Sequence, residues 1–319
     1  MAVAGPNASV VQRGARIAVL RDGRELWRSR GRFRAVGVFA TVGPGAVAFS
    51  YDRYERRRSW TSLYLAPLGG RERELASEER PLGWTRSGEL LTWRFRQGFI
   101  GVYRRAVDGR LLGRAAARLR DIRFLPVSRT LLALSRSGRL ERFDGARWKR
   151  LADLGGLGFG RGASFEPLAG GLIGVLDWNR VAVLREDGSL FASARFPARR
   201  GLDLVAGQSG LVANASGSAV AFAVTSRNRA YGGSGRESIF VLRSGDRQAR
   251  ALYGGRLRFA GKRWATLDWH HDWLLYARTE GKAIALDSRQ PGRRVDLSRL
   301  VRRLTPPTRG GVEISWARP

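Results

Sequence analysis

Cysteine is absent from this 319-residue chain, and histidine and lysine are scarce. Without cysteine there are no disulfide bonds, no thiolate metal sites and no cysteine nucleophile. The two histidines are adjacent, His270 and His271, so chemistry that needs several separated imidazoles is excluded. No apolar run reaches the roughly 18 residues that a membrane helix needs, and the N-terminus lacks the apolar core of a signal peptide. The sequence therefore predicts no membrane span.

Lysine occurs only three times among 58 basic residues, so 55 of them are arginine. The formal net charge is +31, which favours polyanionic partners such as nucleic acid, anionic lipid or acidic glycans. A GC-rich genome produces the same excess of arginine without selection for binding. Because arginine is spread along the whole chain rather than concentrated in one patch, we favour this compositional origin. The surface is still expected to attract anions.

Helical periodicity is also scarce, and what remains is a repeat of short strands. Six windows combine a polar or glycine-rich turn with an apolar strand that ends in a bulky residue. They are VGPGAVAF (42–49), RSGELLTW (86–93), VSRTLLAL (127–134), LAGGLIGV (168–175), ASGSAVAF (215–222) and WHHDWLLY (269–276). A second set of windows follows them and reads as strand, turn, strand: 61–76, 99–114, 139–152, 180–193, 238–252 and 282–297. This spacing matches the 40 to 50 residues of a four-stranded propeller blade.

The termini complete the repeat. Residues 16–28 form one more outer hairpin, and 312–319 (VEISWARP) have the pattern of an inner strand. We predict an all-β β-propeller of seven four-stranded blades, with six as the alternative. The ring is closed by pairing of residues 313–316 with the N-terminal strand at 9–11, because an unpaired first blade would expose ladder groups. The whole chain, 1–319, is taken as one domain. Its approximate blades are 9–30 with 312–319, 34–76, 80–114, 119–152, 162–197, 201–253 and 256–304.

The repeats resemble those of the TolB-like (WD40-like) β-propeller family. Its turn signature is Ser-Pro-Asp-Gly before a strand that ends in small and aromatic residues. The windows ASGSAVAF (215–222) and RSGELLTW (86–93) resemble eroded copies of it, although no intact copy is present. The small α/β domain that precedes the propeller in TolB itself is absent. The resemblance implies a propeller fold and an extracytoplasmic location, without one particular activity.

The histidines lie in DWHHDWLLYAR (268–278) and raise the question of a metal site. Zinc needs three or four protein ligands, and adjacent residues of a strand point to opposite faces. The repeat places His270 and His271 where other repeats carry a small turn residue and glycine, so we expect a turn there. With Asp272 they remain weak metal candidates.

Two other kinds of site were considered. The glycine-rich segment GGLGFGRG (155–162) links two predicted strands, whereas a nucleotide loop follows a strand and opens a helix, so we expect a plain connection. No G-x-S-x-G nucleophile elbow occurs. Near the C-terminus, 296–304 is expected to be a last strand followed by a helical turn capped by Asp296.

The strongest candidates lie on two segments predicted to be long loops, 51–60 and 226–237. In a propeller such loops share a face with the blade-to-blade connections, of which 155–162 is one. Guanidinium groups suit carboxylates and phosphates, and aromatic rings suit bases or sugars. The candidate partner-binding residues are Arg56, Arg57, Arg58, Trp60, Arg161, Arg227, Arg229 and Tyr231. A solvated face with compositional arginine is the alternative.

The sequence therefore favours a non-catalytic binding or scaffold propeller that captures an acidic protein partner or an anionic ligand. The alternatives are an enzyme with a central-channel site, such as a lyase or glycan hydrolase, and a binder of nucleic acid or another anionic polymer. We expect no cofactor, and we expect the protein to be a monomer. Ala2, Val3 and Ala4 resemble the end of a signal-peptide cleavage site, which favours an extracytoplasmic location. A true start at Met1 would favour the cytoplasm.

Overall fold

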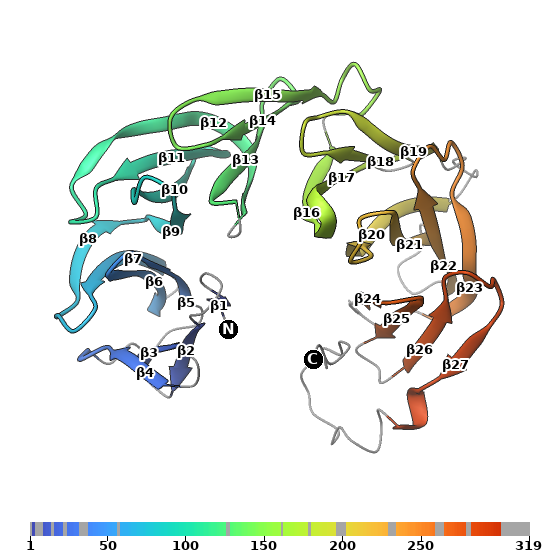
Figure 1. Ribbon diagram of the computed structural model, residues 1–319, viewed down its shortest axis with the longest axis horizontal. Helices are drawn as coiled ribbons and strands as arrows, with labels where there is room; N and C mark the ends of the chain where they lie inside the picture. Colours follow the sequence, from blue (N-terminus) through green and yellow to red (C-terminus); the bar gives the residue numbers. More distant parts are fainter. Residues whose placement is uncertain are drawn as a thin grey trace. The chain divides into compact units, whose positions relative to one another are not determined.

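The structure is a computed structural model that describes residues 2–3, 9–13, 16–21, 24–31, 38–55, 58–125, 128–160, 162–177, 180–195, 202–228, 234–258, 265–278 and 282–300. The chain divides into two compact units, residues 1–150 and 151–319, which are described separately. The described residues form five four-stranded antiparallel sheets and one seven-stranded sheet (Figure 1). No helix in these ranges is long and apolar enough to cross a membrane.

Unit 1 begins with two four-stranded sheets whose strands follow in chain order. The first contains β1 (Ala2–Val3), β2 (Ser9–Arg13), β3 (Arg16–Arg21) and β4 (Arg24–Arg28). The second contains β5 (Val38–Gly43), β6 (Ala46–Glu55), β7 (Arg58–Pro67) and β8 (Arg73–Ser77). The seven-stranded sheet contains β9 (Arg80–Trp84), β10 (Leu90–Arg96), β11 (Phe99–Arg105), β12 (Leu111–Leu125), β13 (Thr130–Ser135), β14 (Arg139–Phe143) and β15 (Trp148–Asp153). Unit 2 begins within β15, at Leu151.

Unit 2 contains three four-stranded sheets. The first has β16 (Ser164–Leu168), β17 (Leu172–Asp177), β18 (Arg180–Arg185) and β19 (Leu190–Arg195), with a single 3-10 turn, η1 (Ala169–Gly171). The second has β20 (Leu202–Ala213), β21 (Ala219–Asn228), β22 (Ser234–Arg243) and β23 (Arg250–Arg258). The third has β24 (Ala265–His270), β25 (Trp273–Arg278), β26 (Lys282–Asp287) and β27 (Arg294–Asp296).

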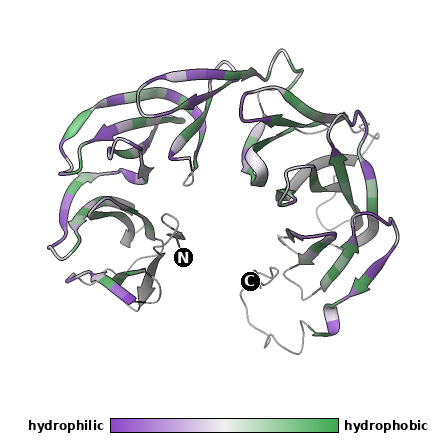
Figure 2. Cartoon of the chain, viewed as in Figure 1, coloured by the Kyte–Doolittle hydropathy of each residue, from purple (hydrophilic) through white to green (hydrophobic). Residues whose placement is uncertain are grey.

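The apolar strand of each predicted window is the second strand of a repeat. Strand β13 has five consecutive buried residues, and β17 has the same pattern, so both faces of each strand are buried. The last strands of the repeats are more polar: all three residues of β27 are exposed. Figure 2 shows hydrophilic stretches on such last strands, β15 and β27 among them. The apolar windows of the sequence therefore mark the core.

Glycines allow neighbouring inner strands of unit 1 to approach closely. A Cβ atom added at Gly83 in β9 would lie 2.1 Å from the ring of Phe124 in β12. One added at Gly43 in β5 would lie 2.2 Å from the ring of Trp84 in β9. Each aromatic ring thus covers the bare backbone of the preceding inner strand, and successive repeats interlock.

Strand β12 departs from the expected division between two repeats. Its first half pairs with β11, with Leu119 opposite Ile100, and its second half pairs with β13, with Leu125 opposite Thr130. Arg118, at the junction, has a φ of 58°. The end of one predicted blade and the start of the next are therefore one continuous strand, because no glycine or proline interrupts residues 114–125.

The predicted long loops were wrong for most of their length. Residues 51–55 and 58–60 continue strands β6 and β7, and the register pairs Arg53 with Trp60. In unit 2, β21 and β22 likewise extend to residues 228 and 234. Aromatic residues such as Tyr51 and Tyr54 favour strand, and this preference prevails over the arginines between them.

The termini give a mixed result. The two-residue strand β1 was not predicted, and it pairs with β2 through Ala2 opposite Val10 and Val3 opposite Ser9. Residues 312–319, the predicted closing strand, lie outside the described residues. Ring closure, the number of blades and the single-domain boundaries therefore stay predictions. At the end of β27, residues 298–300 are helical and the Ser298 N–H donates to Asp296 Oδ1 at 2.8 Å, which confirms the capped helical turn.

Candidate functional site

The structure describes three of the eight predicted binding residues. Arg58 begins β7 opposite Glu55, and Trp60 lies in the same strand. Arg227 lies in β21 opposite Asp203 and belongs to unit 2, whereas the other two belong to unit 1. The remaining five lie outside the described residues: Arg56, Arg57, Arg161, Arg229 and Tyr231. The prediction that all eight share one face stays a prediction.

Unit 1 nevertheless has an aromatic and arginine-rich surface around Trp60. We call it the aromatic–arginine edge and define it as Phe39, Trp60, Glu78, Arg80, Trp93, Arg94, Phe95 and Arg96. Three of its rings are largely exposed: Phe39 (46%), Trp60 (55%) and Phe95 (61%). They lie where β5 begins, where β7 begins and where β10 ends. Antiparallel order places these strand ends on the same side of their sheets.

Arg80 joins two sheets across this edge. Its guanidinium carbon lies 5.0 Å from the centre of the Phe39 ring and 5.3 Å from that of Trp93. Trp93 also pairs with Arg80 across the β9–β10 ladder. The cation–π contacts fix the planar guanidinium between two rings, each contact contributing roughly 0.5–1 kcal/mol. The edge is therefore ordered before any partner arrives.

Glu78 connects Trp60 to the same cluster. Its N–H donates to the Thr61 carbonyl at 2.6 Å, and its carboxylate accepts a hydrogen bond from Arg94 Nη2. Glu78 has a φ of 61°, a conformation that residues other than glycine rarely adopt. The hydrogen bond and the ion pair hold it there, at the junction between β8 and β9.

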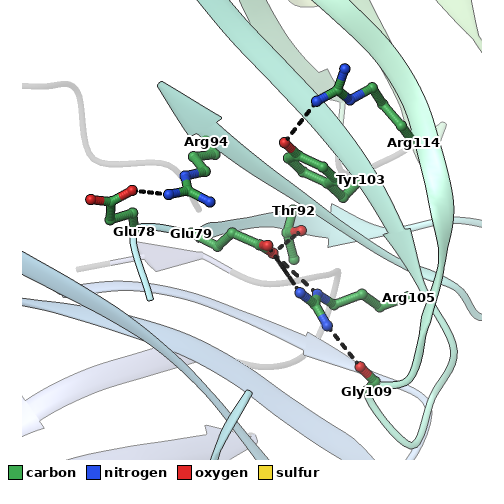
Figure 3. A network of polar contacts seen from close by, with 8 residues as sticks. All are labelled: Glu78, Glu79, Thr92, Arg94, Tyr103, Arg105, Gly109 and Arg114. Atoms are coloured by element: carbon green, nitrogen blue, oxygen red, sulfur yellow. Dashed lines mark hydrogen bonds and ion pairs between the residues drawn. The ribbon is translucent and has the colours of Figure 1, made fainter. Parts of the chain in front are cut away.

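A buried ion pair supports the edge from below (Figure 3). Glu79 and Arg105 have side chains only 9% and 8% exposed, with Arg105 Nη2 at 2.9 Å from Glu79 Oε1. Thr92 Oγ1 donates to Glu79 Oε2 at 2.8 Å, and Arg105 Nη1 donates to the Gly109 carbonyl at 3.0 Å. Since Glu79 stands between Glu78 and Arg80 in sequence, this network fixes the backbone that carries both.

Sequence reasoning located Trp60 but missed Phe39, Arg80 and Phe95. A local signal exists only for Phe95, which lies between two arginines in the segment RFR (94–96), next to a tight turn. In the structure Gln97 and Gly98 form that turn, both with positive φ. Phe95 lies near the end of β10 opposite Ile100 of β11, beyond the last pair that β10 forms with β9, Trp93 with Arg80.

The histidine segment forms the predicted turn. His270 ends β24, and His271 has a φ of 50°, where the corresponding turns of other repeats carry Gly45, Gly88 and Gly217 with φ of 74°, 82° and 64°. Trp269 Nε1 donates to the His271 carbonyl at 2.9 Å. Asp272 pairs with Arg289 at 2.8 Å. Within the described ranges, no three histidine, aspartate or glutamate side chains are grouped to hold a metal ion.

The glycine-rich segment 155–162 is a connection whose amides are engaged by the protein's own carboxylates. The N–H groups of Gly155 and Gly156 donate to Asp153 Oδ1 at 3.0 and 3.4 Å. The N–H of Gly160 donates to Asp177 Oδ2 at 2.6 Å. These amides are therefore not directed at a phosphate, in keeping with the expected plain connection.

Comparison with known proteins supports the fold assignment. No protein-family model matches the chain, and no curated protein matches it. Among solved structures, Hsv2 from Kluyveromyces lactis with a complete loop 6CD has a TM-score of 0.50 at 10% identity, covering 88% of this chain and 90% of its own. AztD from Citrobacter koseri has a TM-score of 0.45 at 9% identity, covering 91% and 94%. The WD40 domain of SCAP from fission yeast has a TM-score of 0.41 at 7% identity, covering 89% and 82%.

The likeness to Hsv2, together with the antiparallel sheets, shows that this chain has a β-propeller fold. The predicted all-β propeller class is confirmed. At 10% identity the likeness describes the fold alone, so the function has to be argued from the surface.

Proposed function

We propose that this protein is a non-catalytic binding propeller that captures an acidic protein partner through the aromatic–arginine edge of unit 1. The observation that carries the proposal is the set of three largely exposed rings, Phe39, Trp60 and Phe95, with arginines between them. Centres of protein interfaces are enriched in aromatic residues and arginine, and a few such residues supply most of the binding energy.

The charge distribution indicates an acidic partner. Several of the chain's own carboxylates pair with arginines inside the protein: Glu79 with Arg105, Glu89 with Arg104, Asp121 with Arg123, Asp272 with Arg289 and Asp287 with Arg293. Others, including Asp144, Asp153 and Asp187, accept hydrogen bonds from backbone N–H groups of turns. At a net charge of +31, a large excess of guanidinium groups remains for an external acidic surface.

The test uses a fluorescent 20-residue peptide rich in glutamate and leucine as the acidic probe. We compare the Trp60→Ala/Phe95→Ala variant with a matched control, Val107→Ala/Leu111→Ala. The control residues are 52% and 51% exposed and lie in and after the β11–β12 turn, at the opposite end of β11 from the turn that follows Phe95. Loss of an interface hot spot of about 2 kcal/mol weakens binding roughly 30-fold.

Fluorescence anisotropy is expected to show a dissociation constant at least tenfold higher for Trp60→Ala/Phe95→Ala and unchanged for the control. Equal losses in both variants would place the partner elsewhere. Tighter binding of a 20-nucleotide single-stranded DNA, weakening steeply with salt, would replace the acidic protein by nucleic acid.

A further inference from the structure

A groove of about 510 Å³ runs along the outer edge of β19 in unit 2. Its floor is formed by residues 192–195 of that strand. One wall is the connection after β15, through Leu157 and Phe159, and the other is the β22–β23 turn at 245–247. Arg180 and Ala182 of the neighbouring strand β18 also line it, so the groove includes the outer edge of β19 and the sheet surface beside that edge.

The β22–β23 turn covers only part of this edge. The Gly245 N–H donates to the Phe191 carbonyl at 3.0 Å, and the Ser193 N–H donates to the Asp246 carbonyl at 3.3 Å. Because the hydrogen-bonding direction alternates along a strand, the Ser193 carbonyl and the Arg195 N–H are the next groups directed outward. Neither has a hydrogen-bond partner among the described residues. An open strand edge is a template for pairing with another chain.

Three arginines surround this open edge. Arg180 and Arg195 lie directly opposite each other in the β18–β19 ladder, and Arg247 lines the wall. Like charges in this cross-strand position destabilise a sheet. None of the three forms an ion pair within the described part of the chain. The one acidic residue among the described lining residues, Asp246, accepts a hydrogen bond from the Arg243 N–H at 2.7 Å.

Arg180 is held in place by the glycine-rich connection. Its Nη1 donates to the Leu157 carbonyl, and its guanidinium carbon lies 5.6 Å from the centre of the Phe159 ring. Gly158 has a φ of +78°, which favours glycine, and a Cβ atom there would lie 2.1 Å from Arg180 Nη1 and displace the guanidinium. The glycine-rich segment 155–162 therefore positions Arg180 at the groove, together with its own side chains Leu157 and Phe159.

We propose that this groove binds an extended acidic peptide segment of a partner protein by strand addition to β19. The peptide backbone pairs with the Arg195 N–H and the Ser193 carbonyl. An acidic side chain of the peptide meets Arg195 and Arg247, and a neighbouring apolar side chain packs against Leu157 and Phe159. Strand addition derives affinity from main-chain hydrogen bonds and specificity from side-chain pockets. This site lies in the other unit from the aromatic–arginine edge and does not depend on the function proposed for that edge.

The test uses a fluorescein-labelled decapeptide of alternating glutamate and valine, a glutamine–valine version and an N-methylated version that cannot form the backbone pairs. The variant Arg195→Gln/Arg247→Gln is compared with the control Arg294→Gln/Arg299→Gln. The control removes two exposed arginines of unit 2, one in β27 and one shortly after it, neither of which lines the groove. Binding is measured by anisotropy and located by hydrogen exchange with mass spectrometry.

We expect the groove variant to bind the acidic decapeptide at least tenfold more weakly, and the control variant to bind it normally. The glutamine and N-methylated peptides should bind at least tenfold more weakly to the native protein, and exchange in β19 should slow when the acidic peptide is present. Equal weakening in both variants, no protection of β19, or unchanged affinity after N-methylation would overturn the inference.

A last comparison separates this site from the proposed function. Protection of β19 should persist in the Trp60→Ala/Phe95→Ala variant, whose lost surface is in unit 1. If that variant also loses the protection, the groove is not an independent site and the inference is wrong. Equal affinity for a ten-nucleotide single-stranded DNA would likewise overturn it in favour of non-specific anion binding.

Discussion

The buried pair Glu79–Arg105 should contribute more to stability than the half-buried pair formed by the adjacent arginine, Arg104. Arg105 directs Nε and Nη2 at Glu79, with distances of 2.9 to 3.1 Å, and both side chains are less than a tenth exposed. Replacement by methionine in Arg105→Met leaves the Glu79 carboxylate buried with the Thr92 hydroxyl as its remaining side-chain donor. An uncompensated buried charge of this kind lowers the free energy of unfolding by about 3–5 kcal/mol.

The adjacent residue supplies the matched control. Arg104 makes an equally short bidentate pair with Glu89, at 2.7 and 2.8 Å, but the two side chains are 35% and 18% exposed. Solvent screens this pair, so Arg104→Met should lower the free energy of unfolding by only about 0–1 kcal/mol. The two arginine-to-methionine variants therefore compare pairs with similar hydrogen bonds and different burial, so a difference in the free energy of unfolding reports the effect of burial.

The assay is urea unfolding followed by tryptophan fluorescence and circular dichroism, with the slope of the free energy against urea compared between variants. The double variant Glu79→Leu/Arg105→Met should recover at least about 2 kcal/mol relative to Arg105→Met, because both charges are then absent. Similar losses for Arg104→Met and Arg105→Met, or no recovery in the double variant, would refute the reasoning.

Three further outcomes are expected. Gly83→Ala should lower the free energy of unfolding by about 1–3 kcal/mol in urea denaturation, because its Cβ would collide with the ring of Phe124. His271→Gly should raise it by about 1 kcal/mol, since glycine adopts the φ of 50° without strain. The backbone N–H of Ser189 holds the pKa of Asp187 below its ordinary value of 3.8, so its stabilising effect is present above pH 3.8 and is lost as the pH falls through the lowered pKa; acid titration of Asp187→Asn should lack that loss.

Each of these has a contrast that would contradict it. Gly101→Ala should change stability by less than about 0.5 kcal/mol, because the nearest atom to its Cβ, Tyr103 Oη, lies at 3.4 Å. His271→Ala removes the imidazole but keeps the strain of a positive φ. If its free energy of unfolding rose as much as that of His271→Gly, the strain would come from the imidazole ring and not from the backbone. An Asp187→Asn variant with the native acid dependence would show that its carboxylate does not act.

The sequence predicted the fold through features that are local. Short continuous apolar runs mark β13 and β17, and small turn residues before them mark the hairpins. It also placed His271 in a turn, because the repeats could be compared position by position. Each of these signals spans only a few consecutive residues, so it can be recognised in the sequence without knowledge of the three-dimensional structure.

The surface was harder to predict because its members meet only in three dimensions. Phe39, Arg80 and Trp93 belong to three strands of two sheets, and no short pattern links them. With 55 arginines, one more beside an aromatic residue is inconspicuous. The groove along β19 depends in turn on which backbone groups the next sheet leaves open, a property of strand pairing that composition does not encode.

Strand β12 has a consequence for how the protein is built and how it comes apart. In most repeat proteins each unit opens at its own free energy plus that of its interfaces, so units can be lost or duplicated separately. Here one strand from Leu111 to Leu125 is hydrogen-bonded to β11 by its first half and to β13 by its second. Amide protons of β11 and β13 should therefore exchange as one cooperative block. A break within β12 would leave half a strand on each side, so we expect these two repeats to fold and unfold together.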